Sequence, residues 1–404
     1  MIKQILHTFF TKISASALGF ATIILISQVL GAEQKGEQAF IVLNIAILMQ
    51  IFTLVGNSTL IYFTPRYRFN LLVIPSVLWI LLMIVLCVIV AFFVPNIIFD
   101  HFVPVLIISS LASLTEISQF LLLGKQKIIQ ANRVKIISPL LTITILFIQW
   151  LFNDLDSVNN FIFALFVSYV ISTGYGIIIV YKFNERNQSV PTVKELTSMT
   201  KLIFAKGATK QIGSIIQTLN YRLLFYILAI YFGDKIVGVY SNAVSLTEAV
   251  MLFGSSLALV QYSKLSNTSD RVKSRLLTLK MTKINAAFTS LCLLIMCLLP
   301  SDIYVWLFGE DFVRVGYIIR LLSVGILLLS CSSNFTQYFA SQGNFSISTF
   351  ASAAGLIITL SLGLWLIPMY SIEGAAVSTV ISFAVTTVIE AVYFFFLFDK
   401  KTSK

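Results

Sequence analysis

Residues 71–94 read LLVIPSVLWILLMIVLCVIVAFFV, an apolar run without a charged side chain. A helix needs about 20 apolar residues to cross a bilayer, so this run is long enough for one crossing. The same character extends over the chain of 404 residues, which is 58% hydrophobic and only 11% charged and has a mean hydropathy of +0.93. A water-soluble protein of this size would lack the polar side chains to cover its surface. The sequence therefore predicts an integral membrane protein.

Further apolar runs, each bounded by charged residues, Pro or Gly, bring the predicted membrane spans to twelve. They are residues 5–30, 38–63, 71–94, 102–123, 136–152, 161–181, 205–232, 236–262, 284–299, 316–340, 345–367 and 372–398. The strands of a membrane barrel would show ten-residue alternation instead. Because twelve spans use roughly 240 to 270 residues, no soluble domain of ordinary size fits in the remainder. We expect an all-α membrane protein.

The basic residues are distributed unevenly between the two sides of the membrane. If both termini are cytoplasmic, Lys35, Lys235 and Arg314 are the only basic residues in the outer loops. Acidic residues, in contrast, concentrate in those loops. This pattern follows the positive-inside rule, and one missed span would reverse every later loop. The net charge of +11 thus reflects topology. A nucleic-acid-binding protein would gather its basic residues on one folded face, so that function is not expected.

Cysteine and histidine offer no metal site. The four cysteines all fall inside predicted spans, so we expect no disulfide framework in the outer loops. His7 and His101 fall on opposite sides of the membrane, which excludes a shared metal ion. We expect neither a metal nor a cofactor.

Similar features recur at equivalent places in the two halves of the chain. Leu30-Gly31-x4-Gly36 follows the first predicted span, and Phe232-Gly233-x4-Gly238 follows the seventh. Gln119-Phe120 comes shortly before Gly124, as Gln337-Tyr338 comes before Gly343. Parallel repeats of this kind are typical of transporters that rock one half against the other. The alternative is that glycines recur at membrane turns by chance.

The stretch 182–204 is among the longest cytoplasmic connections. It lies at the midpoint of the chain and separates the first six predicted spans from the last six. We therefore expect an N-terminal six-helix bundle at residues 1–183, a cytoplasmic linker at 184–204 and a C-terminal six-helix bundle at 205–404.

Four short motifs, in this order and spacing, resemble those of bacterial polysaccharide flippases of the Wzx type. They are Leu30–Gly36, Phe232-Gly233 with Gly238-Val239-Tyr240-Ser241-Asn242-Ala243, Phe308-Gly309-Glu310-Asp311-Phe312, and Leu366-Ile367-Pro368 followed by Gly374-Ala375-Ala376. The resemblance covers nearly the whole chain and is strongest from residue 220 onward. The chain departs from the family pattern by placing Tyr370-Ser371-Ile372-Glu373 before Gly374.

The resemblance implies the fold of the MOP (multidrug/oligosaccharidyl-lipid/polysaccharide) exporter superfamily, with two six-helix bundles of the MATE type around a central cavity. It also implies translocation of undecaprenyl-diphosphate-linked oligosaccharide from the inner to the outer leaflet of the bacterial inner membrane by alternating access. The product would be O-antigen lipopolysaccharide or capsule. A polysaccharide polymerase and a chain-length regulator are the further partners that it suggests.

Five charged residues fall well inside predicted spans, namely Glu116, Arg222, Glu248, Arg320 and Glu390. A charge at the centre of a membrane helix costs about 2.5–3.5 kcal/mol on insertion scales, so each should face a cavity or a partner. Glu116, Arg222 and Glu248 lie within roughly 6 Å of one level near the midplane. Arg222 and Glu248 are on spans joined by a tight turn, and an ion pair between them is expected. Glu116, Glu248 and Glu390 are the candidates for coupling transport to H⁺ or Na⁺. Alternatively, Glu390 could simply face the cytoplasmic vestibule.

Polar residues recur every three or four positions along the span at 205–232, and we expect this face to line water. The candidate substrate-binding residues are Lys206, Lys210, Gln211, Ser214, Thr218, Asn220, Tyr221, Arg222 and Arg320. Arg222 would hold the diphosphate, because a guanidinium offers paired hydrogen bonds to phosphate oxygens. Topology alone explains Lys206 and Lys210 equally well, and Arg320 lies close enough to the outer end of its span to reach the interface. The alternative is that the serines and the Arg222–Glu248 pair only hold helices together.

Two other functions are compatible with parts of this pattern. A multidrug exporter of the same superfamily would share the fold and the midplane carboxylates but would favour organic cations, against which the basic residues of 205–232 argue. A membrane polysaccharide polymerase would need a sizeable outer loop with catalytic groups, and the outer loops are short. The chain also lacks a phosphate-cradling Gly-rich loop, so ATP coupling is not expected. The sequence predicts a transporter and not an enzyme.

Overall fold

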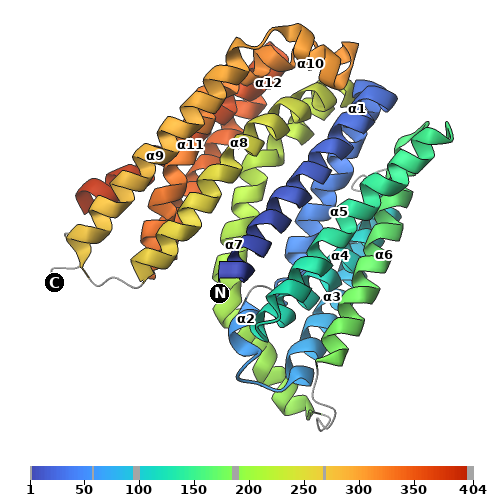
Figure 1. Cartoon of the computed structure of the whole chain (residues 1–404), viewed down its shortest axis with the longest axis vertical. Helices are drawn as coiled ribbons and strands as arrows, with labels where there is room; N and C mark the ends of the chain where they lie inside the picture. Colours follow the sequence, from blue (N-terminus) through green and yellow to red (C-terminus); the bar gives the residue numbers. More distant parts are fainter. Residues whose placement is uncertain (1, 57–58, 94–100, 184–190, 267–269, 398–404) are drawn as a thin grey trace. The chain divides into compact units, whose positions relative to one another are not determined.

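The computed structural model of the chain describes residues 2–56, 59–93, 101–183, 191–266 and 270–397, and within these ranges it is built from helices without β-strands (Figure 1). The α-helices are α1 (Ile2–Phe52), α2 (Thr59–Phe63), α3 (Phe69–Phe93), α4 (Phe102–Gly124), α5 (Ile128–Leu151), α6 (Val158–Lys182), α7 (Val193–Phe232), α8 (Asp234–Ser266), α9 (Arg271–Leu298), α10 (Ser301–Phe308), α11 (Val315–Ser341) and α12 (Phe345–Val392). A 3₁₀ turn, η2 (Glu310–Phe312), precedes α11, and a π-helical turn, η3 (Tyr393–Leu397), follows α12. The expected all-α architecture is confirmed.

Ten of the described helices are long and apolar enough to cross a membrane, and two of them are double. The backbone leaves the helical region inside α1 at Gly31 (φ 76°) and inside α12 at Ser371 (φ 51°). Glycine adopts a positive φ at little cost, which explains why α1 turns at this residue. Counting the two halves of α1 and of α12 separately gives the twelve spanning segments that the sequence predicts.

Several helices are longer than the apolar runs that predicted them. α5 begins at Ile128 instead of 136, α7 at Val193 instead of 205, and α9 at Arg271 instead of 284. The run at 38–63 divides, because its long helix ends at Phe52 and α2 is separate; α10 was not predicted. Hydropathy detects only the part of a helix that is apolar enough for lipid, whereas backbone hydrogen bonds continue through Lys- and Arg-rich turns outside it.

The added length of α7 begins inside the stretch 184–204 that the sequence suggests as a linker. Thr192 and Glu195 form a capping box, in which the backbone N–H of Thr192 donates to Oε2 of Glu195 over 2.8 Å. This hydrogen bond holds the pKa of Glu195 below its usual value. One turn on, Met199 and Ile203 are buried in a hydrophobic cluster with Leu121. An amphipathic start of α7 therefore packs on the first six spans.

The contacts divide the chain into two compact units. The first comprises Met1–Leu30 and Phe40–Ile215, and the second comprises Gly31–Ala39 and Ile216–Lys404. In the first unit α4 packs against both α5 and α6 (Figure 1). In the second unit α11 packs against α8, α9 and α12. The segment Gly31–Ala39 is thus attached to the second unit, although the helical residues on either side of it belong to the first; we call it the junction segment.

Two glycines of the repeated motif explain how the junction segment packs. A Cβ on Gly36 would lie 1.9 Å from the carbonyl oxygen of Asp234, and a Cβ on Gly238 would lie 1.9 Å from that of Ala32. The same 202 residues separate Gly36 from Gly238 and Ala32 from Asp234. The two copies of the motif therefore contact each other through equivalent atoms, and only glycine permits so close an approach.

Polar contacts join η2 and the start of α11 to their neighbours, including the start of the junction segment. Asp311, in η2, accepts a hydrogen bond from the backbone N–H of Ala32 over 3.2 Å and pairs with Lys235 over 2.8 Å. Arg314 pairs with Glu373 over 2.5 Å. Lys235 and Arg314, which the sequence places in outer loops, thus each find an acidic partner.

Buried polar side chains hold the helices of the second unit together. Asn285 of α9 donates to the carbonyl oxygen of Ser330 in α11 over 2.8 Å, and the Ser330 hydroxyl donates back to Asn285 over 3.0 Å. α8 approaches closely at this point, since a Cβ on Gly254 would lie 2.5 Å from Asn285. These contacts fix α8, which carries the site described next, against its neighbours.

Candidate functional site

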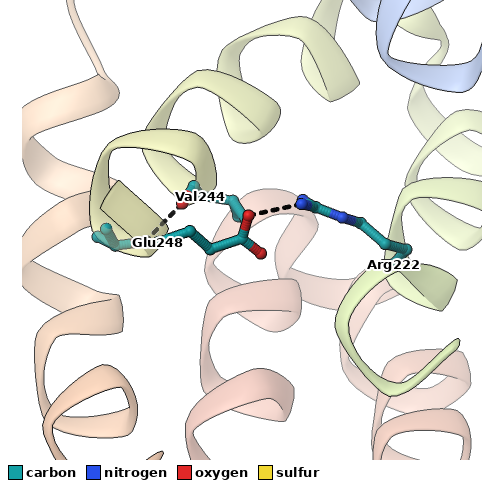
Figure 2. Close-up of polar contacts among 4 residues, drawn as sticks. Arg222, Val244 and Glu248 are labelled. Carbon is teal, nitrogen blue, oxygen red and sulfur yellow. Dashed lines mark hydrogen bonds and ion pairs between the residues drawn. The ribbon is translucent and has the colours of Figure 1, made fainter. Parts of the chain in front are cut away.

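The expected ion pair between Arg222 and Glu248 is formed. Figure 2 shows the guanidinium of Arg222 on α7 and the carboxylate of Glu248 on α8 pointing toward one another, and Nη2 and Oε2 are 2.5 Å apart. The two side chains are 26% and 32% exposed, so the pair lies at a partly open surface of the second unit. The ring of Phe225 lies 5.3 Å from the guanidinium carbon and covers another side of it.

Local backbone geometry brings these two side chains together. α7 ends at Phe232, the chain reverses at Gly233 with φ 76°, and α8 begins at Asp234. A two-helix hairpin with so short a turn keeps α7 and α8 adjacent, so Arg222, ten residues before the end of α7, meets Glu248, fourteen residues after the start of α8.

Lys35 adds a second cation that the sequence analysis did not identify. The sequence assigns it to an outer loop, but in the structure it lies within α1 and is 2% exposed in the second unit, so it is not a loop residue. Its ammonium donates to Oγ of Ser241 on α8 over 3.1 Å, and the positive charge of Arg222 acts on it. Across the described ranges, no carboxylate lies within ion-pair distance of Lys35.

We call Lys35, Arg222 and Glu248 the cationic cluster: Arg222 pairs with Glu248, and the charge of Arg222 acts on the second basic residue, Lys35. The error about Lys35 has a physical origin. Hydropathy analysis ends the first span at residue 30 and treats the polar residues after it as a loop, whereas the helix resumes directly after Gly31 and packs on α8. The signal in the sequence was the position of Lys35, next to the second glycine of a repeated motif.

The candidate residues along α7 are divided between the two units. Lys206 and Lys210 lie on this helix, but their side chains are outside the described structure. Gln211 and Ser214 belong to the first unit, where Nε2 of Gln211 donates to the carbonyl oxygen of Gln50 over 2.9 Å and Ser214 is exposed. Thr218 belongs to the second unit and is half-buried.

Asn220 and Tyr221 make contacts within the second unit. Oδ1 of Asn220, a residue that is 4% exposed, accepts hydrogen bonds from Thr359 over 2.5 Å and from Ser382 over 2.8 Å. Since both acceptor positions of this oxygen are occupied, Asn220 joins α7 to α12 in this structure and is not part of an open wall. The ring of Tyr221 packs edge-on against Phe383, with ring centroids 5.3 Å apart.

In the described structure Arg320 contacts none of the three residues of the cationic cluster. It is exposed on α11, and its Nε donates to the carbonyl oxygen of Gly316 over 3.3 Å. An exposed guanidinium one turn into a helix fits the expectation that it can reach the interface.

Glu390 is buried, and it does not face an open vestibule. Its carboxylate, on α12, is 1% exposed and accepts hydrogen bonds from the hydroxyls of Ser332 (2.5 Å) and Thr336 (2.9 and 3.1 Å) on α11. No Lys or Arg within the described ranges forms an ion pair with it. A buried carboxylate without a cationic partner favours a bound proton or a bound cation.

Glu116 belongs to the first unit. It is half-buried on α4, and its charge interacts with that of Lys135 on α5. Over the described part of the chain, no group of three His, Cys, Asp or Glu side chains is arranged to hold a metal ion.

Two curated proteins are similar to parts of this chain, while no protein-family model matches it. The probable low-salt glycan biosynthesis flippase Agl15 of Haloferax volcanii is 26% identical over 175 residues, which are 41% of this chain and 36% of that protein. The capsular polysaccharide biosynthesis protein CapF of Staphylococcus aureus is 26% identical over 227 residues, which are 55% of this chain and 54% of that protein. The matches thus span about a third and about half of the length of these relatives.

Solved structures share the fold over nearly the whole chain. A multidrug resistance MATE family transporter of the MOP superfamily, in its inward-facing conformation, aligns with a TM-score of 0.76 and 13% identity over 96% of both chains. The lipid II flippase MurJ, in an inward closed conformation, aligns with a TM-score of 0.76 and 16% identity over 99% of this chain and 88% of its own. One of these structures is named as a transporter and the other as a flippase. The chain therefore has the fold of the MOP superfamily transporters, and its resemblance to polysaccharide flippases is confirmed.

Proposed function

We propose that the protein is a flippase that moves a lipid-linked oligosaccharide from the inner to the outer leaflet of the membrane. The observation that carries this proposal is the cationic cluster, in which two basic side chains, Arg222 and Lys35, are accompanied by one acid inside a membrane-spanning fold. An excess positive charge in a medium of low dielectric constant favours an anionic ligand. The glycan biosynthesis proteins that resemble this chain support the same class of substrate.

The head group of such a substrate fits the chemistry of Arg222. A diphosphate must pass the apolar interior, and a guanidinium can donate two parallel hydrogen bonds to phosphate oxygens. The Arg222 side chain is partly exposed and can therefore exchange its bond to Glu248 for one to phosphate. Sugar hydroxyls would meet the polar face of α7 that carries Gln211, Ser214 and Thr218, and Lys206 and Lys210 would attract the diphosphate at the inner mouth. The polyprenyl tail can remain in lipid.

The finer identity of the substrate follows from the family resemblance. We propose undecaprenyl diphosphate as the carrier, O-antigen lipopolysaccharide or capsule as the product, and the bacterial inner membrane, with both termini cytoplasmic, as the location. A polysaccharide polymerase and a chain-length regulator would act on the exported unit. Transport would proceed by alternating access as the six-helix bundles rock. Glu390, Glu248 or Glu116 would exchange H⁺ or Na⁺ during this cycle.

Multidrug export is the second candidate, because a MATE family transporter shares the fold. Such an exporter would bind organic cations, and these would be repelled by the net positive charge of Lys35, Arg222 and Glu248. The charge of the cluster therefore favours the flippase.

The test is complementation of a strain that lacks this gene. Arg222→Ala should insert normally but leave the lipid-linked repeat unit in the inner leaflet, with surface glycan reduced at least about tenfold, because a lost charge-assisted contact of this kind is worth 1.4 kcal/mol or more. Arg222→Lys should retain part of the export, since it keeps the charge and loses the paired geometry.

Arg133→Ala, which removes an exposed arginine of α5, is the matched control and should export normally. Normal surface glycan from Arg222→Ala would contradict the proposed site. Unpolymerised repeat units reaching the outer leaflet in the deletion strain would contradict the proposed function and favour a polymerase.

A further inference from the structure

We propose that Lys35 is the second positive charge of the anion site and that it makes the site prefer a diphosphate head group over a monophosphate. This inference rests on the proposed function, and it adds Lys35 as the residue that sets the preference for a diphosphate. Lys35 is buried in this structure, so it acts through its charge on an anion held by Arg222 and not by direct contact.

The backbone around Lys35 is fixed on the second unit by three independent contacts. Asp311 accepts a hydrogen bond from the N–H of Ala32 at one end of the junction segment. Gly36, the next residue after Lys35, packs on the carbonyl oxygen of Asp234, and Gly238 packs on that of Ala32. A side chain attached to so constrained a backbone has a defined direction, and that of Lys35 leads to α8.

The side chain of Lys35 ends beside the face of α8 that carries Glu248. Its ammonium donates to Ser241, whose own hydroxyl donates to the carbonyl oxygen of Gly238 over 2.8 Å. Ser241 and Glu248 are seven residues apart, which is two helical turns and about 10 Å along one face. Lys35 thus lies at one end of the polar stripe whose other end holds the Arg222–Glu248 pair.

The cationic cluster contains two basic residues but one acidic residue. Glu248 neutralises one of the two cations, Ser241 is neutral, and the described structure offers Lys35 no carboxylate. Buried charges are normally paired, and a partner missing from the protein points to a ligand that supplies it. An anion bound nearby would stabilise the ammonium form of Lys35, so the ligand that this arrangement favours is an anion.

The number of cations indicates which anion fits better. Arg222 alone can match the charge of one phosphate group. A second phosphate brings a further negative charge, and without Lys35 that charge would enter a site of low dielectric constant with no counterpart. With Lys35 present, the second phosphate adds attraction. Arg222 and Lys35 together should therefore make the site bind lipid diphosphates more tightly than lipid monophosphates.

The experiment uses the purified full-length protein in nanodiscs and two probes with the same tail, farnesyl diphosphate and farnesyl monophosphate. The wild-type protein should bind the diphosphate at least about tenfold more tightly. In Lys35→Met this ratio should fall close to one, while Lys35→Arg, which keeps the charge, should restore it. Lys201→Met, which removes an exposed lysine of α7 in the first unit, is the matched control and should keep the wild-type ratio.

The melting temperature separates this role from a packing role. Because Lys35 has no carboxylate partner, Lys35→Met should melt at the wild-type temperature or above it. An unchanged ratio in Lys35→Met would overturn the inference, whether or not its melting temperature falls. Equal wild-type affinities for the two probes would overturn the inference and leave the flippase function standing. Failure of the wild-type protein to bind either probe would overturn both.

Discussion

Glu390 and Lys35 are both buried charged side chains without an ionic partner in the described structure, but their surroundings differ. The Glu390 carboxylate receives hydrogen bonds from Ser332 and Thr336, whereas the Lys35 ammonium has one neutral acceptor in Ser241. A carboxylate can satisfy such an environment by taking up a proton, and it then stays in place as a neutral group. At the scale of single residues, Glu390 is thus suited to carry H⁺, and Lys35 is suited to attract an anion.

The replacement Glu390→Gln tests the proposed coupling role. Glutamine keeps an oxygen that accepts from the Ser332 and Thr336 hydroxyls, so the protein should fold, whereas Glu390→Ala should lose about 1–3 kcal/mol of folding stability because both hydroxyls lose their acceptor. In proteoliposomes, Glu390→Gln should transport at a rate that no longer responds to an imposed proton or sodium gradient. Glu310→Gln, in the η2 turn, is the control and should keep the response. A Glu390→Gln protein that still responds to the gradient would remove Glu390 from the coupling mechanism.

At the scale of elements, the two Gly-x4-Gly motifs do two separate jobs. Gly31 and Gly233 share a positive φ of 76° and reverse or redirect the chain. Gly36 and Gly238 lie within helices and allow those helices to touch through their backbones. The same pattern in each half of the chain thus creates both a bend and a contact surface, and the two surfaces fit each other.

Alanine substitution distinguishes these contacts from chance placement. Gly36→Ala and Gly238→Ala each put a Cβ 1.9 Å from a carbonyl oxygen, and we expect each to destabilise the protein by about 1–3 kcal/mol or more through overpacking. Gly19→Ala, also on α1, meets no atom within 4 Å and should be neutral or stabilising, since alanine favours helix by about 1 kcal/mol. Thermal unfolding in detergent measures all three variants. Equal melting temperatures for Gly36→Ala and Gly19→Ala would mean that the close approach does not exist.

At the scale of the whole molecule, the distribution of charge predicts the orientation in the membrane. Lys125 and Lys127 lie around the turn that joins α4 to α5, whereas Asp154 and Asp156 lie around the turn that joins α5 to α6. These turns are at opposite ends of α5. The positive-inside rule assigns the first to the cytoplasm and the second to the outer side.

Cysteine labelling checks this orientation. In a variant whose four native cysteines are replaced, Gln126→Cys and Asn153→Cys place a thiol in each of the two turns, both at exposed residues. A membrane-impermeant maleimide added to intact cells should label Asn153→Cys, and it should label Gln126→Cys only after the membrane is opened. The reverse pattern would mean that the chain is inserted with its termini outside.

Apolar runs and the positions of Lys and Arg were sufficient to predict an all-helical membrane protein with twelve spans, because transfer into lipid acts on each segment almost independently of the others. The same reasoning found the Arg222–Glu248 pair, since both residues lie deep in spans joined by a short turn. It could not find Lys35, because burial of that residue depends on the junction segment docking through Gly36 and Gly238 onto a helix about 200 residues away. Hydropathy is a local property of the chain, whereas the environment of a single charge depends on which distant helices pack around it, and only the tertiary structure decided that.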